Sequence, residues 1–213
     1  MVRWERAPAA VAGLAAFGAL AFAVELGRTA EFDLAVRAAV HGWASPTLTA
    51  AMRLMTTAGS GYFLVPLAAI LVWRWEARGK HASTILLTAG GLSAEALSEL
   101  LKMLFHRPRP DVFFGLSPAE TYSFPSGHAF ITAVYFGILW GIPGRGRRWR
   151  VAAAALTAVV GFSRVYLGYH YPTDVIAGWA LGLAWLALWA TVAERSGLSN
   201  PGGRQEGRPP ASQ

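Results

Sequence analysis

The chain has 213 residues, of which 54% are hydrophobic and only 15% are charged. This balance lies far from that of a soluble domain and favours a protein whose solvent is the bilayer. The net charge of +7 is dispersed in short clusters between apolar runs, so we expect no nucleic-acid partner. Because the sequence contains no cysteine, disulfide frameworks, thiolate metal sites and cysteine nucleophiles are excluded.

Several apolar stretches approach the roughly 20 residues that a helix needs to cross a bilayer. We therefore predict an all-α fold, an integral membrane bundle of six transmembrane helices that forms one domain over residues 1–195. Charged residues interrupt the third and fifth spans, so those charges should face protein or water. The predicted spans cover residues 7–24, 54–73, 82–104, 127–143, 150–168 and 173–193.

The first span, at 7–24, follows Arg3 and Arg6, a pattern that also fits a cleaved signal peptide. Its charge-free run is longer than the roughly 7–15 residues of a signal core, so we expect a retained span. Either outcome leaves the later spans oriented alike.

Between the first two spans, Phe32, Val36, Val40 and Trp43 recur at helical spacing. This pattern predicts a short interfacial helix on the outer leaflet or, equally, a packed loop helix. The segment 196–213 is rich in Gly, Pro, Ser and Arg without an apolar period, so we predict a disordered tail.

Basic residues predict the orientation, because Lys and Arg in short loops remain on the cytoplasmic side. With the amino terminus inside, the inner loops and ends hold most of the basic residues. Both termini are then cytoplasmic, and the protein is expected in the plasma membrane. The inner basic residues are Arg3, Arg6, Arg74, Arg78, Lys80, Arg145, Arg147, Arg148, Arg150, Arg195, Arg204 and Arg208.

Three polar clusters lie at the outer ends of predicted spans, where neutral residues would be the ordinary choice. This topology brings all three to the same face of the membrane. The clusters are Lys102 with Arg109-Pro110, then Pro125-Ser126-Gly127-His128, then Ser163-Arg164 with His170 and Asp174.

The clusters supply the groups that phosphoryl transfer needs. Lys102, Arg109 and Arg164 can surround a dianion, and arginine presents forked donors that match phosphate oxygens. Ser126 lies where it could cap the fourth span, so that the amides of Gly127 and the next residue point toward an anion. A phosphate fits this set better than a neutral substrate.

Two histidines can divide the roles of nucleophile and acid. His170 and Asp174 are four residues apart, and Pro172 suits the first turn of the last span. Asp174 can then reach one imidazole nitrogen, fix the tautomer and leave the other nitrogen as the nucleophile.

Together the clusters resemble the tripartite signature of the type 2 phosphatidic acid phosphatase family, with matching spacing throughout residues 102–174. The resemblance implies that His170 is the nucleophile that forms a phosphohistidine, with Asp174 as its orienting partner. It also implies that His128 protonates the leaving group and that the family needs no metal or other cofactor. The implied phosphate-binding residues are Lys102, Arg109, Ser126, Gly127 and Arg164.

Several of these residues also have ordinary structural interpretations. Arg107-Pro108 rivals Arg109-Pro110 as the first motif, and only the six-residue gap after Lys102 selects Arg109. Glu95 and Glu99 share a helix face with Lys102, so we expect structural ion pairs.

The pairs Gly137 with Gly141 and Gly178 with Gly182 predict close helix packing within the chain. We assign no catalytic function to His41, His81 or His106.

The leading hypothesis is a membrane enzyme that hydrolyses a lipid phosphomonoester or diphosphate on the extracytoplasmic face. Undecaprenyl diphosphate, phosphatidylglycerophosphate and phosphatidic acid are the candidate substrates. A lipid phosphotransferase with the same phosphohistidine, and a non-catalytic lipid-binding or transport protein, are the alternatives. Soluble acid phosphatases and vanadium haloperoxidases share this kind of site, but the predicted spans disfavour both. The oligomeric state is not predicted.

Overall fold

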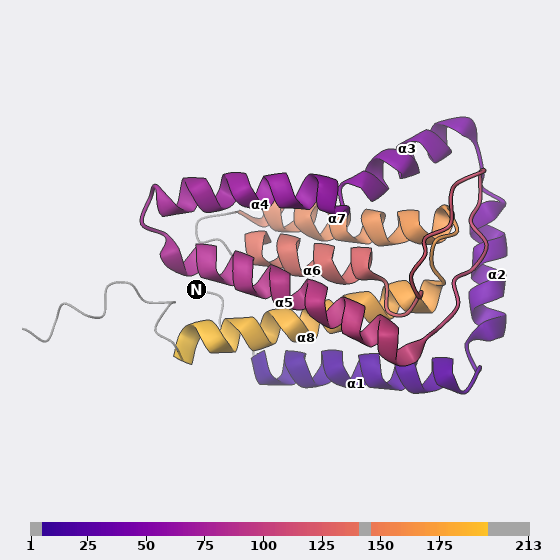
Figure 1. Cartoon of the computed structure of the whole chain (residues 1–213), viewed down its shortest axis with the longest axis horizontal. Coiled ribbons are helices and arrows are strands. Elements are labelled where there is room, and N and C mark those ends of the chain that lie inside the picture. Colours follow the sequence, from indigo (N-terminus) through magenta and orange to yellow (C-terminus); the bar gives the residue numbers. More distant parts are fainter. Residues whose placement is uncertain (1–5, 141–145, 196–213) are drawn as a thin grey trace, which may run out of the picture.

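The structure, a computed structural model, describes residues 6–140 and 146–195, and within these ranges it contains eight α-helices and no strand (Figure 1). This confirms the all-α class. The predicted tail at 196–213, the first residues of the predicted domain and the end of the span at 127–143 lie outside the described residues. The helices are α1 (Arg6–Glu25), α2 (Ala30–His41), α3 (Pro46–Thr57), α4 (Gly61–Glu76), α5 (His81–Phe105), α6 (Gly127–Trp140), α7 (Arg147–Tyr166) and α8 (Pro172–Arg195).

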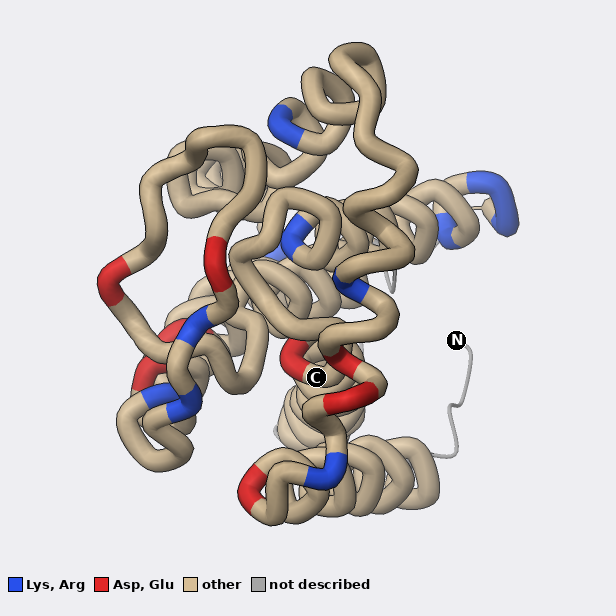
Figure 2. Tube along the Cα trace, turned by 90° about the vertical axis from the view of Figure 1, so that its right-hand side faces the viewer, with Lys and Arg blue, Asp and Glu red and all other residues tan. Residues whose placement is uncertain are grey.

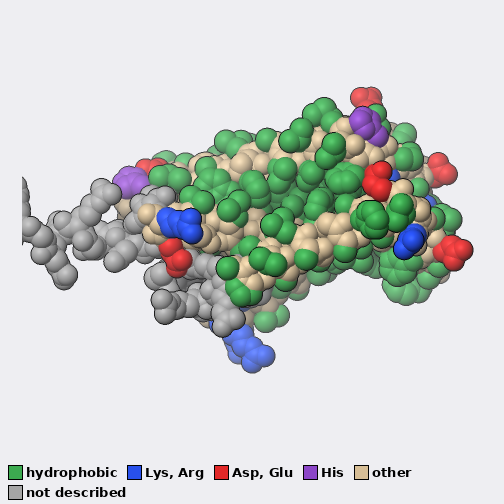
Figure 3. Space-filling view, turned by 90° about the horizontal axis from the view of Figure 1, so that it is seen from below, with side chains coloured by type: hydrophobic (Ala, Val, Ile, Leu, Met, Phe, Trp, Pro, Cys, Tyr) green, Lys and Arg blue, Asp and Glu red, His purple; other side chains and the backbone are tan. Residues whose placement is uncertain are grey.

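Most helices run along the long axis of the molecule, and α2 lies across one end (Figure 1). By length and composition, α1, α5 and α8 are able to cross a membrane, and α3 with α4 would add a fourth, bent span. The apolar helix α6 is shorter, and α7 carries arginines near both of its ends. Hydrophobic side chains cover the flank of the molecule, whereas charged side chains gather at its two ends (Figure 3).

The second predicted span, 54–73, is wrong as a continuous helix. The chain breaks after Thr57, and α3 and α4 meet at 46°. A side chain on Gly59 would lie 3.1 Å from the ring of His128 and 3.2 Å from Thr132, so the break fits closely against α6. The break directs α3 against α7, close to the loops at one end of the bundle.

The helix predicted after the first span is present as α2, but two of its charged side chains, Asp33 and Arg37, face inward, whereas Glu31 and His41 are exposed. Asp33 and Arg37 are buried, whereas Phe32 and Trp43 are 51% and 61% exposed. The carboxylate of Asp33 accepts hydrogen bonds from the chain at the start of α8, which compensates its burial. The expected hydrophobic face is therefore only partly directed at the protein.

Small residues let α6 and α8 approach closely, as the glycine spacing predicts. A side chain on Gly178 would lie 2.7 Å from the carbonyl oxygen of Ser126, and one on Gly182 would lie 2.5 Å from Ala133. Gly137 faces Leu186 of α8 in the same interface, whereas Gly141 lies outside the described residues. The predicted close packing within the chain is confirmed for Gly178 and Gly182, and it positions the start of α6 against the start of α8.

We expect Gly178→Ala to destabilise the fold by about 1–3 kcal/mol, because the added methyl group meets backbone that cannot move aside cheaply. Gly18→Ala is the matched control, because a side chain there meets nothing within 4 Å. That control should be neutral or slightly stabilising through helix propensity. Unfolding in detergent measures both variants, and equal stability of the two would contradict the packing described here.

Candidate active site

The three predicted motifs converge at the end of the bundle that α2 covers. They lie where α5 and α7 end and where α6 and α8 begin. Figure 2 faces this end and shows basic and acidic residues close together among the loops and helix ends. Each motif therefore contributes residues at a helix terminus, where backbone and side-chain polar groups are available for a ligand.

His170 and Asp174 form a buried pair at the start of α8. The Nδ1 atom of His170 lies 3.4 Å from Oδ2 of Asp174, and the side chain of Asp174 is fully buried. Pro172 begins α8, so the four-residue spacing brings the carboxylate back toward the imidazole. The backbone amide of Tyr171 donates to the same Oδ2 atom at 2.9 Å, which fixes the carboxylate.

Arg109 determines which imidazole nitrogen of His170 is unprotonated. Its Nη1 atom lies 3.1 Å from Nε2 of His170 and 3.0 Å from the carbonyl oxygen of Tyr169, to which it donates. A guanidinium has only donors, so Nε2 must accept and the proton lies on Nδ1, facing Asp174. The lone pair of Nε2 therefore points toward Arg109. A phosphoryl group bound by Arg109 would lie beside that lone pair.

The second motif joins the other two. The amide of Ser126 donates to the carbonyl oxygen of Asp174 at 3.0 Å, which ties the start of α6 to α8. A side chain on Gly127 would lie 3.1 Å from Oγ of Ser98 and 3.4 Å from Nζ of Lys102, so the start of α6 lies close to this cation. The expected helix cap is absent, because the buried Oγ of Ser126 has no hydrogen-bond partner. A buried hydroxyl of this kind is available to a ligand.

Arg164 is 7% exposed near the end of α7. Its Nη1 atom donates to Oγ1 of Thr56 at 2.7 Å, and its guanidinium lies 4.1 Å from the ring centre of Tyr169. Its Nε atom is buried and has no hydrogen-bond partner. Thr56, at the end of α3, is a contact that sequence spacing did not indicate. The bend between α3 and α4 brings it to Arg164.

The charges around His170 keep its imidazole neutral. Burial holds the pKa of His170 well below its usual range, and the nearby cations Arg164, Arg109 and Lys102 lower this pKa further, as does His128. Burial also lowers the pKa of Arg109, because Asp174 and Glu99 compensate its charge only in part. The site thus combines a neutral imidazole with an excess of positive charge, which suits attack on an anionic phosphate.

Arg107, the rival of Arg109 in the sequence, has a different place. Its Nη2 atom donates to Asp33 of α2 at 2.7 Å, and its Nη1 atom contacts both Asp174 and, at 2.9 Å, Oγ1 of Thr173. Asp33 in turn accepts from the amide of Thr173 at 3.0 Å. Burial opposes the charge of Arg107, but Asp174 and Asp33 raise its pKa above the ordinary value.

Sequence reasoning missed this second layer of the site. Arg107 and Asp33 hold the carboxylate of Asp174, which lies beside His170, although neither is bonded to the predicted phosphate-binding residues. The two adjacent Arg-Pro dipeptides were a signal for the role of Arg107, because a second arginine beside the same motif needs acidic or polar partners of its own. Asp33 carried no such signal, since it lies 74 residues before Arg107.

The ion pairs expected on α5 are found in part. Nζ of Lys102 lies 2.5 Å from Oε1 of Glu99, which confirms that pair. Glu95 is exposed and, among the described residues, lies within ion-pair distance of no basic side chain. Lys102 is itself 8% exposed. Its ammonium group therefore pairs with Glu99 and lies near the start of α6.

Comparison with known proteins agrees with this geometry. The profile of the PAP2 superfamily matches residues 82–197. The chain is 34% identical to the undecaprenyl-diphosphatase of Sulfolobus acidocaldarius over 71% of this chain and 73% of that protein. It is 31% identical to phosphatidylglycerophosphatase B of Bacillus subtilis over 77% of this chain and 84% of that protein.

A solved structure supports the same assignment. The crystal structure of a transmembrane PAP2-type phosphatidylglycerolphosphate phosphatase from Bacillus subtilis superposes with a TM-score of 0.80 at 30% identity. The match covers 87% of this chain and 96% of that one. The fold is thus that of a membrane PAP2-type phosphatase. The chain belongs to the PAP2 superfamily.

We expect Arg107→Gln to destabilise the protein by about 3–5 kcal/mol, because it leaves the buried carboxylates of Asp33 and Asp174 without their cation. Arg53→Gln is the control, since this arginine makes an exposed hydrogen bond to the carbonyl oxygen of Phe114. The control should cost less than about 1 kcal/mol. Unfolding in a detergent titration compares the two, and a similar small loss for Arg107→Gln would show that the network is dispensable.

The lowered pKa of His170 predicts that its imidazole remains neutral below pH 6.5, where an exposed histidine becomes protonated. Neutral Nε2 is the nucleophilic form, so protonation of His170 should limit turnover only at lower pH. A histidine-labelled NMR titration measures the pKa of His170 directly. Titration of His170 at or above pH 6.5 would contradict this prediction.

Proposed function

We propose that this protein is a lipid phosphatase that hydrolyses a phosphomonoester or diphosphate through a phosphohistidine at His170. One observation carries the proposal: Arg109 and Asp174 contact opposite nitrogens of the same buried imidazole, at 3.1 Å and 3.4 Å. Asp174 fixes the proton on Nδ1, and Arg109 positions an anionic group beside Nε2. A structural histidine would need neither an Nε2 lone pair directed at a cation nor adjacent excess positive charge.

In the first step, Nε2 of His170 attacks phosphorus and the bond from phosphorus to the lipid oxygen breaks. His128 donates a proton to that oxygen, so the lipid leaves as an alcohol or, from a diphosphate, as a monophosphate. Lys102, Arg109 and Arg164 stabilise the negative charge on the transferring group, with Ser126 and the amide of Gly127 as further donors. Asp174 stabilises the imidazolium that forms.

In the second step, water attacks the phosphohistidine and His128 accepts its proton. The phosphorus–nitrogen bond breaks, inorganic phosphate leaves, and His170 returns to its neutral form. The positive charge comes from side chains of the protein itself, so the proposed reaction is independent of a metal ion. This charge is concentrated in the three cations that surround His170.

We propose that the substrate reaches the site from the outer leaflet of the plasma membrane. Six spans are formed by α1, the bent pair α3–α4, α5, α6, α7 and α8, within a membrane domain over residues 1–195, and α2 lies at the outer interface. The exposed Phe32 and Trp43 of α2 and its neighbouring loop support this interfacial position. Basic residues at the opposite end support cytoplasmic termini, with the segment 196–213 as a disordered tail.

The candidate substrates are undecaprenyl diphosphate, phosphatidylglycerophosphate and phosphatidic acid. The names of the two curated relatives support the first two. All three carry a terminal phosphate on a membrane-anchored lipid, so a site at a helix end can reach the phosphate while the tail remains in hydrocarbon. Release of inorganic phosphate without an acceptor alcohol would distinguish this hydrolase from a phosphotransferase.

We expect His170→Ala to reduce phosphate release from these lipids by about 10⁴-fold or more, because no other group can form the intermediate. The assay is run with chelator present, which should leave wild-type turnover unchanged. His41→Gln is the control, since this ring stacks on Phe113 at 4.1 Å outside the proposed machinery, and it should retain activity. Turnover by folded His170→Ala at the wild-type rate would show that His170 is not the nucleophile.

We expect His128→Ala to slow hydrolysis of alkyl phosphates by about 10²–10⁴-fold, because their leaving oxygen needs a proton. A nitrophenyl phosphate has a stable leaving anion, so in His128→Ala the rate of phosphate transfer from this substrate to His170 should fall much less. Single-turnover measurements isolate that step. An equal loss on both substrates would exclude His128 as the acid.

A further inference from the structure

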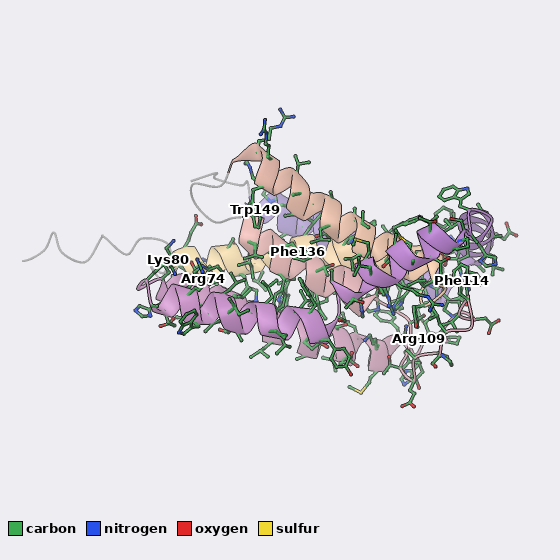
Figure 4. The ribbon with its side chains drawn as sticks, turned by 90° about the horizontal axis from the view of Figure 1, so that it is seen from above. Arg74, Lys80, Arg109, Phe114, Phe136 and Trp149 are labelled. Carbon is green, nitrogen blue, oxygen red and sulfur yellow. The ribbon has the colours of Figure 1, made fainter. Side chains whose placement is uncertain are left out.

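A groove with apolar walls and several basic residues lies toward the opposite end of the bundle from His170. A groove of about 460 Å³ runs between α4 and α7, with α6 as its floor. Figure 4 shows Arg74 and Lys80 on one side of this region, Trp149 of α7 on the other, and Phe136 of α6 between them. The apolar walls include Leu67, Leu71, Phe136, Leu139, Ala153 and Leu156.

Three cations line the same groove: Arg74, Arg78 and Lys80. Arg78 has a structural role, because its Nη1 atom donates to the carbonyl oxygen of Arg74 at 2.9 Å near the end of α4. Among the described residues, no carboxylate lies within ion-pair distance of any of the three. The adjacent Glu76 instead pairs with His81 at 2.6 Å. The groove thus ends in positive charge that the described part of the chain leaves uncompensated.

The dimensions of the groove match one leaflet of a bilayer. Phe63 and Arg74 both line it and lie eleven positions apart on α4, which corresponds to about 16 Å of helix. Half of a typical hydrocarbon core is about 15 Å thick. An acyl chain lying along α4 would therefore reach from the charged end toward the middle of the membrane while its headgroup remained beside Arg74 and Lys80.

We propose that this groove is a binding site for an anionic phospholipid, with one acyl chain against Leu71 and Phe136 and the phosphate at Arg74 and Lys80. Charge complementarity selects this occupant, because a zwitterionic lipid adds an ammonium group that the three cations repel. Apolar walls alone would accept any lipid. The combination of a leaflet-deep apolar groove and uncompensated cations at its end favours the anionic one.

This site is separate from the proposed active site. Lys80 immediately precedes α5, and Lys102 lies 22 positions later in that helix, which corresponds to about 33 Å. The phospholipid would therefore be a structural ligand in the opposite leaflet and not a substrate in transit. Its binding does not depend on the proposed phosphatase activity.

The test compares purified variants by native mass spectrometry after incubation with phosphatidylglycerol or phosphatidylcholine of identical acyl chains. Wild type should retain phosphatidylglycerol about 10-fold more than phosphatidylcholine, and Arg74→Gln/Lys80→Gln should lose that preference. Arg147→Gln/Arg195→Gln removes two exposed cations that do not line the groove, and it should preserve the preference. Lipid bound near His170 is common to all three proteins and cancels in the comparison.

A second pair of variants tests the acyl-chain site. Ala152 is exposed and lines the groove, so Ala152→Phe should fill it and reduce retention of phosphatidylglycerol by about 10-fold. Ala155 is equally exposed on α7 but does not line the groove, and Ala155→Phe should have no effect.

Three results would overturn the proposal. Equal retention of the two lipids by wild type would show that the site does not select for negative charge. Equal loss of the preference for phosphatidylglycerol in the two glutamine variants would show that the lipid does not bind at Arg74 and Lys80. Inorganic phosphate that competes as well as phosphatidylglycerol, with Ala152→Phe unaffected, would show a surface ion site without an acyl-chain groove.

Discussion

The buried residue Asp174 connects the start of α8 with the start of α6 and the loop after α5 in the candidate active site. Its two oxygens receive the guanidinium of Arg107, the amide of Tyr171 and the Nδ1 side of His170, and its backbone carbonyl accepts from Ser126. A buried carboxylate needs such partners, since an unpaired charge at this depth would be expelled or neutralised. The requirement to satisfy Asp174 therefore joins α2, α6, α8 and the loop after α5 around one imidazole.

The candidate active site lies at the ends of the helices, and packing between their apolar middles holds those ends close together. Close packing of Gly178 against Ser126 and of Gly182 against Ala133 fixes α6 beside α8, so the second and third motifs meet. The break at Gly59 has the same effect for α3, which supplies Thr56 to Arg164 and fits against His128. Polar groups are then concentrated where backbone donors are free, and the flanks remain apolar for the bilayer.

The sequence predicted the residues of the candidate active site better than the residues that hold them in place. Local spacing was sufficient for the relation of His170 to Asp174, because Asp174 lies in the first turn of α8 and its carboxylate reaches back to the residues just before Pro172. The role of Arg107 depended on Asp33, a partner distant in the chain, and no local pattern indicates such a pair. The break at Gly59 was missed because the predicted span ran across the small and polar residues Thr56–Gly61, where the chain bends and packs against α6 and α7. The apolar spacing of α2 predicted a helix, but it gave no sign that Asp33 is buried and bonded to the start of α8.

The central claim is that Nε2 of His170 is the atom that accepts the phosphoryl group. Its most direct test is to quench the enzyme during turnover of a lipid phosphate and to map the phosphorylated residue by mass spectrometry, with phosphorus NMR to identify the nitrogen. The account predicts phosphate on His170, bonded to Nε2, and none in His170→Ala. Phosphate on His128, or bonded to Nδ1 of His170, would contradict it.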